Sequence, residues 1–120
     1  SWGEREAWLV TLDASGAIES LMEAIEGLEI YRARRDVIGL IRRINGRMGR
    51  TYDLKDGRVL ILFPTDRMPD RELYLHQLAN SFCASILDLP EAPEFPIEFK
   101  RWPEEMEEVK ASLSGFFGGE

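Results

Sequence analysis

Only one cysteine and one histidine occur among the 120 residues of the chain. The lone Cys83 excludes an internal disulfide and suits a reducing compartment, so we expect a cytoplasmic protein. Nucleophilic centres of the Cys-His or Ser-His-Asp type need an imidazole with partners. The residues spaced around His76 do not supply the further ligands that a metal site or a proton relay requires. The sequence therefore predicts no catalytic centre of these kinds, no metal site and no cofactor.

Long apolar runs and an excess of basic charge are missing as well. No apolar run approaches the length of a membrane span, and no basic-then-apolar segment opens the chain, so we expect no membrane insertion. The 22 acidic residues outnumber the 15 basic ones, and the formal net charge of −7 disfavours general binding to nucleic acid. A chain with 44% apolar and 31% charged residues is typical of one soluble globular domain.

The predicted single domain spans residues 1–120. Its first predicted strand begins almost at once, at Ala7, and this abrupt start suggests a domain cut from a longer protein. Residues 115–120, which include Phe116 and Phe117, are expected to form a flexible tail. Two large apolar rings in such a tail are typical of a contact surface.

Two stretches have the unbroken apolar pattern of strands that are buried on both faces. They lie at 8–12 and 59–63, whereas the strand-like segments at 51–54 and 95–99 are mixed or interrupted by proline. A ferredoxin-like sheet needs this division, because its first and third strands are central and the other two lie at its edges. The predicted fold is therefore α+β, a four-stranded antiparallel sheet with helices packed on it, in the order β-α-α-β-β-α-β-α.

Four helices are predicted from apolar residues at helical spacing. The first begins near the candidate caps Asp13 and Ser15, the second runs from about 33 to 48, the third carries apolar residues from Leu75 to Leu87, and the fourth follows Pro103. In the second helix the side chains expected to point inward are those of Val37, Ile38, Ile41, Ile44 and Met48.

Three arginines project from the other side of this second helix, near small residues. They are Arg35, Arg42 and Arg43, with Gly39 and Gly46 close by in the sequence. A guanidinium cluster of this kind could hold a phosphate or an acidic partner helix. The alternative is a solvated basic face that neighbouring glutamates balance. These arginines are the candidate ligand-binding or partner-binding residues.

The chain resembles the GGDEF domains, the diguanylate cyclase relatives of the adenylyl cyclase palm. The resemblance rests on the element order and on two segments, "WLVTLD" at 8–13 and "YDLKDGRVLILFP" at 52–64, and it covers roughly residues 7 to 115. It implies a cyclase-palm fold. It also places Asp13 at the position of a metal-binding acid, although Asp13 directly after a strand is equally suited to cap a helix.

The departures from the family pattern lie in the hairpin between the second and third strands. Lys55 and Asp56 stand where the resemblance implies paired glycines, and Gly57 and Arg58 stand where it implies acids. Phosphodiester formation on a triphosphate needs two cations held by closely placed carboxylates, which Asp13 alone cannot supply. The family's inhibitory pattern, Arg-x-x-Asp, is also missing, because residues 46–49 read Gly-Arg-Met-Gly. We therefore expect a domain that is not an enzyme.

Several functional hypotheses follow from these residues. The first is a noncatalytic, cyclase-like regulatory or protein-interaction domain of a signalling protein, which contacts a protein partner or flanking domains of the same chain. The alternative is a sensor that binds a phosphorylated or cyclic dinucleotide ligand through the arginine face. An enzyme is the third hypothesis. An RNA-binding sheet is disfavoured, because Val59 to Leu62 offer aliphatic side chains where bases would stack.

Self-association is a further expectation from the charge pattern. The last predicted helix is acidic on its outer side, whereas the second is basic. Unlike surfaces on one chain attract each other, and the contact closes only if two copies of it form across a two-fold axis. The sequence thus predicts a weak, salt-sensitive homodimer.

Overall fold

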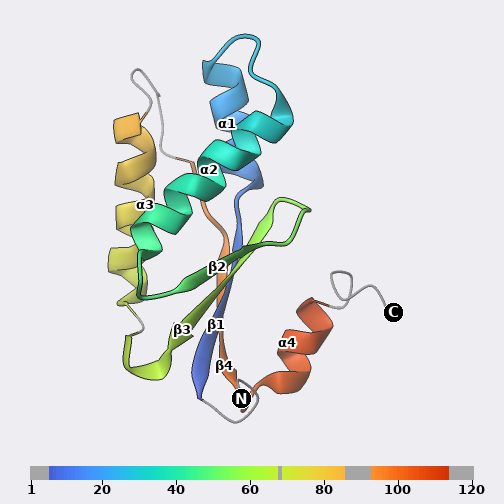
Figure 1. Ribbon diagram of the computed structural model, residues 1–120, viewed down its shortest axis with the longest axis vertical. Helices are drawn as coiled ribbons and strands as arrows, with labels where there is room; N and C mark the ends of the chain where they lie inside the picture. Colours follow the sequence, from blue (N-terminus) through green and yellow to red (C-terminus); the bar gives the residue numbers. More distant parts are fainter. Residues whose placement is uncertain (1–5, 68, 86–92, 114–120) are drawn as a thin grey trace.

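The computed structural model describes residues 6–67, 69–85 and 93–113 (Figure 1). Strands and helices follow the predicted order. They are β1 (Ala7–Asp13), α1 (Ser15–Ala24), α2 (Ile30–Asn45), β2 (Arg50–Asp53), β3 (Arg58–Pro64), α3 (Arg71–Ser85), β4 (Ile97–Trp102) and α4 (Met106–Ser112). The predicted flexible tail at 115–120, including Phe116 and Phe117, lies outside the described residues, and so does Leu87.

The four strands form one antiparallel sheet in the order β2-β3-β1-β4. The two predominantly apolar strands, β1 and β3, are central, and the two mixed strands lie at the edges. The predicted α+β, ferredoxin-like architecture is therefore confirmed. Val10 of β1 lies opposite Ile61 of β3 on one side and Phe99 of β4 on the other. This register places alternate apolar side chains on both faces of the sheet.

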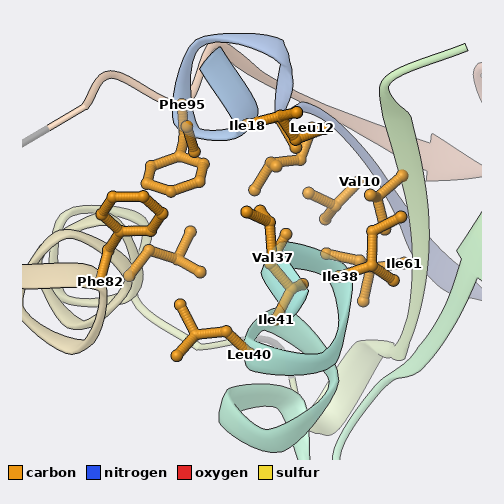
Figure 2. Close-up of a cluster of buried hydrophobic side chains, with 14 of the residues drawn as sticks. Val10, Leu12, Ile18, Val37, Ile38, Leu40, Ile41, Ile61, Phe82 and Phe95 are labelled. Atoms are coloured by element: carbon orange, nitrogen blue, oxygen red, sulfur yellow. The ribbon is translucent and has the colours of Figure 1, made fainter. Parts of the chain in front are cut away.

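Helices α1, α2 and α3 cover one face of the sheet and enclose the main core (Figure 1). Figure 2 shows side chains of α1 and α2 meeting Val10, Leu12 and Ile61 of the central strands. At one end of this core the rings of Phe82 and Phe95 meet edge to face, with their centroids 6.3 Å apart. In α1 and α2 the side with apolar residues at helical spacing is therefore the buried side.

Helix α4 covers part of the opposite face. Its Val109 and the following Leu113 form a smaller buried cluster with Leu9 and Leu54, and three partly buried side chains pack against it: Leu60, Leu62 and Trp102. The division of helices between the faces is therefore uneven. No helix in the described part of the chain is long and apolar enough to cross a membrane.

Some element boundaries differ from those predicted. Helix α2 begins at Ile30 and ends at Asn45, both earlier than predicted from 33–48, and its end is set by Gly46, which adopts a φ of 55°. Met48 therefore lies beyond the helix and is 46% exposed, so its predicted inward position is wrong. Strand β4 begins at Ile97 rather than residue 95, since Phe95 turns into the core. Residues 103–105 form a turn, so α4 begins at Met106 and not directly after Pro103.

A buried polar trio joins α2, β2 and α3, and no sequence pattern predicted it. The Tyr74 hydroxyl donates to Asn45 Oδ1, and Asn45 Nδ2 donates to Thr51 Oγ1 at 2.6 Å. Asn45 is 1% exposed and Tyr74 is 2% exposed. Burial raises the pKa of the Tyr74 phenol, although the hydrogen bond with Asn45 opposes the shift. The trio fixes the end of α2 against the start of β2, next to the arginines described below.

Candidate functional site

The turn between β2 and β3 is held by two aspartates that act on the backbone. Asp53 Oδ1 accepts the N–H of Lys55 at 2.8 Å, and Asp56 Oδ1 accepts the N–H of Arg58 at 3.1 Å. The backbone φ is 70° at Lys55 and 91° at Gly57, both in the left-handed region. Glycine adopts this conformation without the steric cost that a Cβ brings. Residues 55–57 therefore form a tightly ordered turn that leads into β3 at Arg58.

This turn is joined to the end of β1 and the start of α1. The Gly57 carbonyl accepts the N–H of Ala14 at 2.8 Å, and a Cβ at position 57 would lie 2.6 Å from Ser15 Oγ. Neither Asp13 nor Ser15 is the N-cap, because that position is occupied by Ala14 without a side-chain cap bond. Asp13 nevertheless serves the helix start, since its Oδ1 accepts the N–H of Ser15 at 2.9 Å.

Arg58 brings a positive charge to the same end of the sheet. Its guanidinium lies 2.8 Å from Asp56 Oδ2 and donates a second hydrogen bond to that oxygen through Nε, at 2.9 Å. Arg58 also lies opposite Asp13 in the register of β1 and β3. The hydrogen bond with Asp56 is the largest cause that raises the pKa of Arg58, and the charges of Asp13 and Glu98 add to it.

The effect on Asp56 is reciprocal. The side-chain hydrogen bond from Arg58 lowers the pKa of the Asp56 carboxyl, so this carboxylate stays charged and paired. Arg58 is therefore ion-paired with Asp56, and the charges of Asp13 and Glu98 also favour its charged form. In the described residues, no three His, Cys, Asp or Glu side chains come together as a group that could hold a metal ion.

The single histidine and the single cysteine of the chain both lie on α3. His76 is exposed on α3, as are Glu72 and Asn80 on the same side of that helix. Cys83 is a free thiol on α3 that is only partly buried.

The three predicted arginines are all exposed, but they do not converge. Arg42 lines an open hollow of about 360 Å³ with Gly46, Gly49, Arg50, Thr51 and Tyr52. Arg43 lines a separate hollow of about 180 Å³ whose other walls are mainly apolar, and Arg35 lines neither. Successive helical residues are rotated by about 100°, so Arg42 and Arg43 point in different directions.

Arg50 is the functional candidate that the sequence pattern missed. It is the first residue of β2 and shares no helical spacing with the arginines of α2. The chain reverses between Gly46 and Gly49, and this reversal brings Arg50 to the hollow that Arg42 lines. Within residues 6–67, 69–85 and 93–113, neither arginine forms an ion pair.

Comparison with known proteins identifies no relative. No family model, no curated protein and no solved structure matches this chain.

Proposed function

We propose that this chain is a noncatalytic, cyclase-like regulatory domain that acts through contacts with a protein partner or with flanking domains of its own chain. In this proposal the domain belongs to a cytoplasmic signalling protein and is a degenerate GGDEF domain. The observation that carries it is the pairing of Arg58 with Asp56, next to Asp13.

The carboxylates at the hairpin end are already engaged within the protein. Cyclases transfer a phosphoryl group with two cations, and acidic side chains must hold those cations. Asp13 accepts a backbone N–H of α1, and Asp56 binds the guanidinium and backbone N–H of Arg58. A cation that belongs to the protein itself thus neutralises Asp56, and a backbone N–H engages Asp13. This arrangement supports a structural role for the hairpin.

The charged surfaces support a role in binding. The exposed arginines of α2 lie on one side of the sheet, and Glu104, Glu107 and Glu108 are exposed around α4 on the other. A contact between the basic α2 of one copy and the acidic α4 of another uses only one patch of each copy. The unused α4 of the first copy and the unused α2 of the second would then lie on the outer sides of the pair, so the contact would not close readily into a two-fold dimer. The homodimer stays a prediction, and an acidic surface of a different protein suits the basic side of α2 better.

A second candidate function is a sensor of a small phosphorylated ligand. The specific observation in its favour is that Arg42 and Arg50 line one hollow and pair with no acid of the described chain.

We expect no cyclase activity from the protein as it stands. Incubation with GTP or ATP and either Mg²⁺ or Mn²⁺ should yield no cyclic nucleotide or cyclic dinucleotide, because Arg58 is paired with Asp56 and Asp13 alone cannot hold two cations. Chromatography of the nucleotides after a long incubation provides the measurement. An Asp13→Asn variant serves as the matched control and should give the same result. Product that forms with the wild-type protein and disappears in Asp13→Asn would contradict the noncatalytic assignment.

A further inference from the structure

We infer that the hollow between the end of α2 and the start of β2 binds the phosphate group of a small anionic ligand. The hollow is lined by Arg42, Arg50, Thr51 and Tyr52, with Gly46 and Gly49 as its small residues. This assignment concerns a different end of the sheet from the Arg58 hairpin turn and does not depend on the noncatalytic role. It names the ligand class of the second candidate function.

Two arginines from different elements line the hollow. Arg42 belongs to the last turn of α2, and Arg50 opens the edge strand β2. Arginine presents several N–H donors in a planar fork that matches phosphate oxygens. Both side chains are exposed and form no ion pair within the described residues, so no acid of this part of the chain competes for them.

The buried polar trio holds Thr51 on the α2 side of β2. Its Oγ1 accepts a hydrogen bond from Asn45 Nδ2 at 2.6 Å, and Asn45 is itself fixed by the buried Tyr74 hydroxyl. A hydroxyl that accepts from one partner keeps its own proton to donate to another. Thr51 lines the hollow, where an anion would provide the acceptor. Arg50 and Tyr52 project from the other face of this edge strand, because successive strand residues alternate, so the Thr51 hydroxyl would meet an anion from the α2 side.

The end of α2 opposes an anion only weakly. A helix C-terminus is equivalent to about half a negative charge, which would repel a phosphate. Arg42 and Arg50 each carry a full positive charge and line the same hollow, so their sum outweighs the helix end. The local potential is therefore positive even though the whole chain has a net charge of −7.

The size and lining of the hollow indicate the ligand class. A volume of about 360 Å³ lies at the lower end of the range for small-molecule sites, roughly 300–1,000 Å³. Tyr52 is 41% exposed and offers a ring beside the arginines. Aromatic rings of this kind stack on the bases of nucleotides. A mononucleotide with a terminal phosphate or diphosphate fits these features, with the phosphate at the arginines and the base at Tyr52.

Calorimetric titrations with pyrophosphate and with ADP test this site in a low-salt buffer. Both compounds should bind saturably with one site per chain, and added salt should weaken the binding. Arg42→Gln and Arg50→Gln should each weaken it at least about tenfold, the effect of one lost charge-assisted hydrogen bond. Tyr52→Leu should weaken the binding of ADP more than the binding of pyrophosphate. Arg35→Gln, an exposed arginine of α2 outside the hollow, is the matched control and should leave the affinity unchanged.

Three results would overturn the inference. The first is the absence of saturable binding by either compound to a protein that is folded by circular dichroism. A second is an equal loss of affinity in Arg35→Gln, which would show a diffuse basic surface in place of a site. The third is binding of a glutamate-rich peptide without binding of pyrophosphate. That last result would leave the noncatalytic protein-contact role intact, so the two proposals fail separately.

Discussion

Replacing Asn45 with alanine is expected to lower the free energy of unfolding by about 3 kcal/mol. Asn45 is 1% exposed and accepts the hydrogen bond of the Tyr74 hydroxyl while it donates to Thr51. Its removal leaves a buried hydroxyl without an acceptor, which costs about 1–3 kcal/mol, and also leaves an unfilled volume. The higher helix propensity of alanine offsets only part of this loss. Urea unfolding followed by circular dichroism measures the difference.

Two further variants separate the hydrogen bonds from the packing. Asn80→Ala alters an exposed asparagine of α3 and should change stability by no more than about 0.5 kcal/mol. Tyr74→Phe leaves Asn45 Oδ1 without its donor and should cost about 1–2 kcal/mol. Because Asn45 and Tyr74 are direct partners, their double variant should lose less than the sum of the single losses. Simple additivity, or a loss below about 1 kcal/mol in Asn45→Ala, would contradict the role of the trio.

Phe63→Ala is expected to be the most damaging core substitution, at about 3–5 kcal/mol. Phe63 lies in the central strand β3 and has no exposed surface. Its ring meets the Tyr74 ring edge to face, with the centroids 5.9 Å apart. Truncation therefore removes buried apolar area and an aromatic contact beneath the buried polar trio. Thermal or urea unfolding of the variant provides the measurement.

Gly49 gives this second prediction a sharper test. A Cβ at position 49 would lie 2.6 Å from Phe63 Cε1 and 3.0 Å from Ile61 Cγ2. Gly49→Ala should therefore cost about 1–3 kcal/mol in the wild-type background, as expected for an overfilled core. In the Phe63→Ala background the ring is gone, and the same change should cost less than about 1 kcal/mol. An equal cost in both backgrounds would show that the Phe63 ring does not limit the space at Gly49.

The sheet could be predicted because its central strands have an unmistakable composition. Five apolar residues in succession at Val59–Phe63 require cover on both faces, and only helices could supply it in a chain of this order. The end of α2 was less predictable. Apolar spacing continues through Met48, whereas the backbone conformation of Gly46 ends the helix before that residue is reached.

The polar features depend on contacts between distant segments, and this explains why the sequence predicted only part of them. Arg42 was a candidate because it lies on a helix face, but Arg50 reaches the same hollow only after the chain has turned. Asn45 and Tyr74 are 29 positions apart, and no periodicity links a helix end to a tyrosine of another helix. The hairpin turn was correctly placed between two strands, although Arg58 belongs to β3 and not to the turn. The ion pair between the turn and β3 depends on the side-chain geometry of Asp56 and Arg58.

A Mn²⁺ titration followed by electron paramagnetic resonance tests the central claim most directly, because free and protein-bound Mn²⁺ give different signals. The claim is that Arg58 supplies the positive charge that the acids at the hairpin end of the sheet would otherwise take from a metal ion. At physiological salt, which suppresses diffuse binding to an acidic chain, we predict no saturable Mn²⁺ binding to the wild-type protein. Stoichiometric binding that is lost in Asp13→Asn would contradict the claim.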